Sequence, residues 1–184
     1  MSEENTFSRI ILIFIAAVAI AVAIVGGYVW ANWVPTPYSG QILSVNYYSI
    51  HNDLSQPTTT EGVGGQNEVY DEILVFANVR VRNVSKEPLY LSDMWAVANL
   101  PGEDDNSSAV ATSDFQKVFI AYADTSQYQK PPLLRDITLQ PGQQVDGMMI
   151  FNYQMNQAKW DSRTGLDINI QFIHKKPLVL HVAK

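Results

Sequence analysis

The chain contains no cysteine, and a long segment near its N-terminus contains no charged residue. Without cysteine there can be no disulfide, no thiolate metal ligand, no cysteine nucleophile and no lipid attached through an N-terminal cysteine. Asp, Glu, Lys and Arg are all missing between Ile10 and Asn52, and residues 10–33 are almost wholly apolar. This apolar segment is the first structural signal in the sequence.

The apolar segment predicts a single transmembrane helix over residues 10–34. At about 1.5 Å per residue, residues 10–33 reach roughly 36 Å, more than the hydrocarbon core of about 30 Å. Arg9 is the only basic residue near this segment. The positive-inside rule therefore predicts a cytoplasmic tail over residues 1–9 and a C-terminal domain outside the cytoplasm, on the inner membrane.

Aromatic residues follow the apolar segment. Amphipathic rings favour the headgroup layer, so Tyr28, Trp30 and Trp33 are predicted to mark the membrane interface. The alternative is a cleavable secretory signal cut near Ala31, which would release a secreted protein. The apolar run is longer than an ordinary signal core of about 7–15 residues, which favours a retained signal anchor.

Small residues recur every four positions within the apolar segment. Ala19, Ala23 and Gly27 would form a stripe on which another helix could pack closely. The sequence therefore predicts two partners for this segment, the membrane and a second transmembrane helix. The other interpretation is an alanine-rich anchor with no partner helix.

The residues after the apolar segment predict a short stalk and one β domain. Pro35 and Pro37 end the helix, which makes residues 35–40 a stalk and leaves residues 41–184 as one domain of ordinary size. Alternating apolar and polar residues, separated by turn-forming clusters, predict an antiparallel immunoglobulin-like β-sandwich of the mainly β class. The predicted strands cover residues 41–50, 73–83, 89–100, 145–153, 166–174 and 178–182.

One short helix is predicted near residue 113. Ser113 and Gln116 have the spacing of a capping box, and Phe115, Phe119 and Tyr122 follow at helical intervals. Residues 118–122 are also apolar enough to form a strand, and the sequence leaves that alternative open.

Three segments together resemble a family of bacterial telokin-like, immunoglobulin-type sandwich domains of unknown function, found in secreted proteins and lipoproteins. They are the strand and Asn turn VFANVRVRNVS of residues 75–85, the strand of residues 89–100, and LQPGQQVDG of residues 139–147. In the last segment Pro141, Gly142 and Gly147 are predicted to serve the fold as turn residues. The resemblance implies a module for binding, adhesion or structure, although this chain lacks the lipidated cysteine.

No motif indicates an enzyme, a cofactor or a metal site. Phosphate-binding, dinucleotide-binding and nucleophile-elbow patterns are all missing. The acidic run of residues 103–105 is interpreted as a solvated turn, because its spacing does not fit a calcium loop. Residues 38–184 hold 11 basic and 16 acidic residues, a formal charge of 11 − 16 = −5, which argues against nucleic acid as a partner.

Four tyrosines are predicted to form a binding rim: Tyr47, Tyr48, Tyr70 and Tyr128. Exposed aromatic residues are enriched at protein interfaces. The predicted function is protein binding by a membrane-anchored, periplasmic module acting as an accessory subunit of a membrane or envelope complex. The alternative is a free-standing envelope module that binds a small ligand through the loop of residues 52–71.

Overall fold

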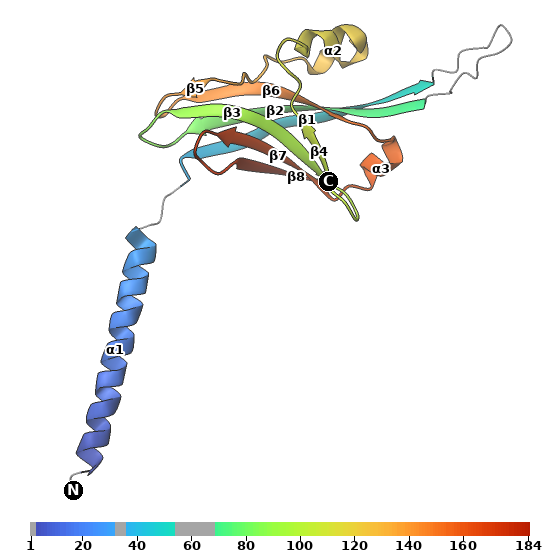
Figure 1. Cartoon of the computed structure of the whole chain (residues 1–184). Coiled ribbons are helices and arrows are strands. Elements are labelled where there is room, and N and C mark those ends of the chain that lie inside the picture. The colour runs from blue at the N-terminus through green and yellow to red at the C-terminus, as the bar shows by residue number, and fades with distance from the viewer. Residues whose placement is uncertain (1–2, 32–35, 54–68) are drawn as a thin grey trace, which may run out of the picture. The chain divides into compact units, whose positions relative to one another are not determined.

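The computed structural model describes residues 3–31, 36–53 and 69–184. The chain divides into two compact units, Met1–Thr36 and Pro37–Lys184. The first unit holds one helix, α1 (Glu3–Ala31), and the second unit holds all the strands (Figure 1).

Helix α1 does not bear out the predicted membrane span. Within the part of the chain that the structure describes, no helix combines the length and the apolar character needed to cross a membrane. The finding contradicts the transmembrane helix predicted over residues 10–34, together with the single-pass signal anchor and the inner-membrane location.

The second unit is built from two antiparallel sheets. The first sheet has the order β1 (Tyr38–Asp53), β2 (Val69–Asn83) and β6 (Gln144–Tyr153). The second has the order β4, β3, β7, β8, with β5 paired to β3. Its strands are β3 (Leu89–Asn99), β4 (Asp105–Ser108), β5 (Thr138–Leu139), β7 (Gly165–Phe172) and β8 (Leu178–Ala183). The prediction of a mainly β, antiparallel fold is confirmed, and the two short strands β4 and β5 were not predicted.

The main core lies between the two sheets. Alternate residues of β2 and β3, such as Val75, Ala77 and Ala96, are fully buried there, as period-2 patterning requires. A short helix, α3 (Gln157–Asp161), brings Trp160 into the same core. Its cap is Asn156, whose side chain accepts a hydrogen bond of 2.8 Å from the Lys159 backbone N–H.

A second, smaller core covers the outer face of the first sheet. Leu74 and Phe76 of β2 and Ile150 of β6 point outward, and helix α2 (Phe115–Ala121) lies over them (Figure 1). The Phe76 and Phe119 rings lie 5.8 Å apart. A 3₁₀ segment, η1 (Ala123–Tyr128), continues this cover.

The predicted helix is confirmed, but its predicted cap is wrong. The residue before the first turn is Asp114, and no side chain caps the helix there. Ser113 therefore does not form a capping box with Gln116. The hydrophobic spacing of Phe115 and Phe119, both buried, determines this helix.

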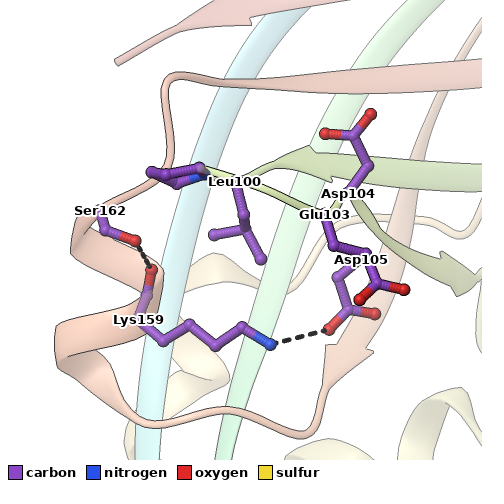
Figure 2. Close-up of a pocket in the computed structure, with 7 residues that line it drawn as sticks. Leu100, Glu103, Asp104, Asp105, Lys159 and Ser162 are labelled. Atoms are coloured by element: carbon purple, nitrogen blue, oxygen red, sulfur yellow. Dashed lines mark hydrogen bonds and ion pairs between the residues drawn. The ribbon is translucent and has the colours of Figure 1, made fainter.

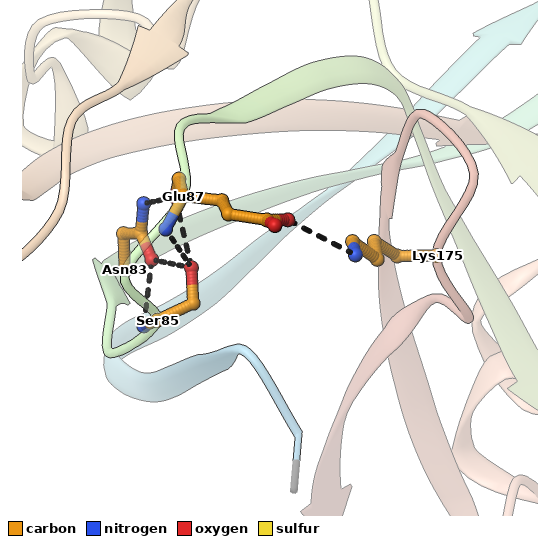
Figure 3. Close-up of polar contacts among 4 residues, drawn as sticks. All are labelled: Asn83, Ser85, Glu87 and Lys175. Carbon is orange, nitrogen blue, oxygen red and sulfur yellow. Dashed lines mark hydrogen bonds and ion pairs between the residues drawn. The ribbon is translucent and has the colours of Figure 1, made fainter. Parts of the chain in front are cut away.

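A fully buried asparagine, Asn83, holds two turns together, and Figure 3 shows its contacts with Ser85 and Glu87 in the first of them. The Asn83 side chain donates hydrogen bonds of 2.8 Å to the backbone carbonyls of Glu87 and Leu139. Its oxygen accepts from the backbone N–H and the hydroxyl of Ser85, at 2.9 and 2.8 Å. The Asn83 carbonyl also accepts from the N–H of Gly142 at 3.0 Å. The turn after β2 is thus joined to the Pro141-Gly142 turn, far away in the sequence.

The three predicted turn residues have different roles. Pro141 and Gly142 form the turn before β6, where Gly142 has a φ of +77° that favours glycine. Gly147 lies inside β6 and does not begin a strand. A Cβ there would lie 2.6 Å from the Cα of Leu133, so Gly147 allows residues 131–133 to run directly beside β6.

Candidate functional site

The four predicted tyrosines do not share one surface. Tyr47 and Tyr48 are neighbours on β1, so their side chains point to opposite faces of the first sheet. The Tyr47 ring lies 5.8 Å from Trp160, on the side of the main core. The Tyr48 ring lies 6.2 Å from Tyr122, on the side of the second core.

The other two tyrosines also differ in environment. Tyr128 is half-buried, and its ring lies 5.6 Å from Phe76 beneath the α2 cover. Tyr70 lies near the start of β2, opposite Asn52, and is 45 % exposed. Tyr48 and Tyr128 therefore contribute to the second core, while Tyr47 and Tyr70 remain largely at the surface.

The residues predicted to lie in or near a membrane belong to α1. Ala19, Ala23 and Gly27 are exposed within their unit, and among the described residues nothing outside the adjoining helix backbone lies within 4 Å of the position that a Cβ would take at Gly27. Tyr28 and Trp30 are also strongly exposed. Trp33 lies outside the described residues, as do residues 54–68 of the predicted binding loop.

An acidic pocket lies where β3 ends and α3 begins. It has a volume of about 610 Å³ and combines an apolar wall with acidic side chains (Figure 2). The Lys159 ammonium lies 4.0 Å from the carboxylate of Asp105. Burial, with a further contribution from the Asp105 charge, raises the pKa of the nearby Tyr153 hydroxyl. The pocket is lined by Leu100, Pro101, Glu103, Asp104, Asp105, Lys159 and Ser162.

The charge of this pocket determines what it could accept. Three carboxylates and one ammonium give it a formal charge of −3 + 1 = −2. No three acidic or histidine side chains among the described residues are placed to hold a metal ion. An apolar wall beside an excess of carboxylates suits a lysine or arginine side chain, because the alkyl stem favours apolar surface and the charged head favours the carboxylates.

A mixed aromatic and polar surface lies on the outer side of the second sheet. The strand register aligns Trp95 with Asn169 and Val179, and the next row aligns Val97, Asp167 and His181. In Figure 1, α2 lies over β2 and β6, whereas no helix of residues 69–184 lies over β7 and β8. We call this surface the open face; it is formed by Tyr90, Trp95, Val97, Asp167, Ile173, Val179 and His181, with Asn169 buried among them.

Large side chains on the open face remain accessible. Tyr90, Ile173 and Val179 are 50 %, 47 % and 51 % exposed. Tyr90 and Ile173 lie side by side, since the Ile173 N–H donates to the Tyr90 carbonyl at 2.9 Å. The face therefore presents apolar area next to hydrogen-bonding groups.

A histidine–aspartate pair links β7 and β8 on this face. The Nδ1 of His181 lies 2.6 Å from Oδ1 of Asp167, and Asn99 donates to the other carboxylate oxygen at 3.2 Å. Partial burial would raise the pKa of Asp167, but these hydrogen bonds outweigh it and hold the pKa below its usual value. The imidazole packs on Gly165, where a Cβ would lie 2.7 Å from its Cε1.

Comparisons with known proteins leave the family unassigned. No family model and no curated protein matches the chain. A functionally unknown protein from Listeria monocytogenes EGD-e aligns with 71 % of this chain and 74 % of its own, with 9 % identity and a TM-score of 0.34. A protein provisionally named ApaA from Bordetella pertussis aligns with 82 % of this chain and 93 % of its own, with 10 % identity and a TM-score of 0.28. Similarities this weak carry no argument, and the telokin-like resemblance stays a prediction.

Sequence reasoning missed the open face, although a signal for it exists. Polar residues Asp167, Asn169 and Gln171 alternate with apolar residues along the sequence of β7, although Asn169 itself is 7 % exposed. This pattern is typical of a sheet with one solvated face. Placing Trp95 on the same face requires the pairing of β3 with β7, which the sequence alone does not specify.

Proposed function

We propose that this chain acts by binding rather than by catalysis, and that it recognises another protein through the open face. The observation that supports the proposal is the set of exposed aromatic and aliphatic side chains on an uncovered sheet. Tyr90, Ile173 and Val179 are each about half exposed. Interfaces between proteins combine such apolar side chains at the centre with polar groups at the rim.

The contrast with the first sheet supports this proposal. There the apolar side chains of Leu74 and Phe76 are covered by α2, within the same chain. The open face has large side chains but no such cover from residues 69–184. A partner protein would bury them and so remove apolar area from water.

The expected partner carries basic residues. The acidic pocket begins at Leu100, directly after the end of β3, which supplies Trp95 and Val97 to the open face. A partner that covers this face could place a lysine or arginine beside Glu103 and Asp104. Electrostatic complementarity of this kind favours specificity and a fast association rate.

Affinity capture with two matched variants tests the proposal. The full chain is used as bait in an extract of its native cells, beside Val179→Asp on the open face and Ile120→Asp on α2. Ile120 is 80 % exposed and serves as the matched control. We expect the captured protein to fall by about tenfold or more with Val179→Asp, because a charge would be buried at the interface, and to be retained with Ile120→Asp.

Three results would contradict the proposal. They are the capture of no protein, undiminished capture by Val179→Asp, and an equal loss with Ile120→Asp. Denaturation midpoints of the two variants, compared with that of the parent chain, show whether each variant is folded. The alternative function, a small ligand held by residues 52–71, concerns a loop that falls mostly outside the described residues.

A further inference from the structure

Two rows of polar side chains cross the uncovered end of the first sheet's outer face. The register places Ser39 of β1, Arg82 of β2 and Gln144 of β6 in one row. It places Gln41, Arg80 and Asp146 in the next row. Paired residues of neighbouring strands share a face, so each row has an arginine at its centre with a side chain on either side.

The second row already contains a bound carboxylate, which belongs to the protein itself. The Arg80 guanidinium donates from Nε to Oδ1 of Asp146 at 2.8 Å and from Nη2 to Oδ2 at 2.6 Å. This is the bidentate geometry by which arginine recognises a carboxylate. The hydrogen bonds from Arg80 hold the pKa of Asp146 below its usual value.

The first row has the same arrangement without the carboxylate. Gln144 occupies the position opposite Arg82 that Asp146 occupies opposite Arg80. Arg82 is exposed, and no ion pair or side-chain hydrogen bond joins it to another residue of the described ranges 3–31, 36–53 and 69–184. A pocket of about 320 Å³ lies over both rows and is lined by Ser39, Gly40, Gln41, Arg80, Arg82 and Gln144.

We propose that this pocket binds a carboxylate group, held by Arg82 as Asp146 is held by Arg80. The Ser39 hydroxyl and the Gln144 amide, on either side of Arg82, supply two further uncharged donors. Arg80, Arg82 and Asp146 together carry a formal charge of +2 − 1 = +1, which matches one monoanionic group. The Asp146 carboxylate, close by, disfavours a phosphate dianion.

The site does not depend on the proposed function. It lies on the first sheet, whereas the open face belongs to the second sheet. A carboxylate could come from a free small acid or from an acidic side chain of a protein. Both sources present the same two carboxylate oxygens to Arg82, so the geometry of the site does not distinguish them. The titration below does.

NMR titration of the full chain tests the site. The Nε–H signal of Arg82 is followed while sodium acetate is added at constant ionic strength, with sodium chloride as the reference titration. We expect a saturable shift at Arg82 and a much smaller one at Arg80, which is already occupied. N-acetylglutamate amide, with N-acetylglutamine amide as its uncharged control, presents a protein-like carboxylate. Tighter binding of this compound than of acetate indicates a protein side chain as the source, and equal binding indicates a small acid.

Two substitutions make the test specific. Gln144→Asp places a carboxylate opposite Arg82 and should weaken acetate binding by about tenfold, because the site becomes self-occupied. Asp146→Asn removes the carboxylate from Arg80 and should create a second saturable shift there. Both positions are exposed, so the fold should tolerate either change.

The proposal is overturned by any of three results: no saturable shift at Arg82, undiminished binding in Gln144→Asp, or phosphate binding tighter than acetate. If a variant failed to fold, Arg82→Gln would serve instead, with loss of the acetate response as the expected result. Retention of that response would reject the site.

Discussion

The two outer faces of the sandwich differ in how their side chains are covered. On the first sheet, Leu74, Phe76 and Ile150 point outward and are buried beneath α2. On the second sheet, Asp167 and His181 lie among exposed aromatic and aliphatic side chains, and no helix of residues 69–184 covers them. The apolar part of an outer face needs a cover within the chain, whereas a mixed surface can remain in water and bind.

The largest expected effect concerns the covered face. Phe76→Ala removes a fully buried ring that contacts both Phe119 and Tyr128. We expect a loss of about 3–5 kcal/mol in the free energy of unfolding, measured by urea denaturation. Phe76→Leu, which keeps most of the volume, should cost less than about 1.5 kcal/mol. A cost below about 1 kcal/mol for Phe76→Ala would show that packing under α2 is unimportant.

The next largest effect concerns residues 131–133, which run directly beside Gly147 of β6. Gly147→Ala places a Cβ 2.6 Å from the Leu133 backbone, which cannot move as a side-chain end can. We expect a loss of about 1–3 kcal/mol in the free energy of unfolding, as for other overpacked sites. Gly40→Ala is the matched control, because its Cβ would meet only the Leu178 and Leu180 side-chain ends at 2.7 and 2.9 Å. A greater loss at Gly40 would refute this account.

A smaller, pH-dependent effect is expected at Asp167 on the open face. Its pKa is lower in the folded chain than the unfolded value of about 3.9, so the carboxylate stabilises the fold above that pH. The contribution is lost as the pH falls through the lowered pKa. Asp167→Asn should therefore lower the free energy of unfolding near pH 7 and have almost no effect near pH 2. A cost that does not change with pH would show that the effect is steric.

The smallest expected effect is on stability at Val179, on the edge strand β8 of the open face. Val179→Ser should change the free energy of unfolding by less than about 0.5 kcal/mol, because Val179 is half exposed. The same substitution should weaken partner capture measurably. A loss of stability comparable to that of Phe76→Ala would show that the open face is part of the folded core and not a binding surface.

The strands could be predicted from the sequence, because apolar and polar residues alternate along β2, β3 and β7. Such alternation indicates a strand with one buried face. The cover over β2 could have been predicted as well. Residues 73–77 and 148–151 are apolar without interruption, which indicates burial on both faces. Phe115 and Phe119 of the predicted helix supply the matching apolar surface.

Other features could not be predicted, because they depend on contacts distant in sequence. Asn83 reads as an ordinary turn residue, and only the structure shows its hydrogen bond to the Leu139 carbonyl. Tyr47 and Tyr48 are adjacent in the sequence, but neighbours on a strand face opposite ways, so the four predicted tyrosines form no single rim. The sequence does not show that Asp146 and Gln144 each lie beside an arginine. Only the strand register places Asp146 opposite Arg80 and Gln144 opposite Arg82.

Site-specific photo-cross-linking in the native cells tests the central claim most directly. A photoreactive phenylalanine analogue is placed at Val179 on the open face or at Ile120 on α2, in the full chain. Ile120 is the more exposed of the two positions, so random collisions would favour it. The account predicts a discrete protein adduct from position 179 and none from position 120. An adduct from position 120 alone, or none from either position, would contradict it.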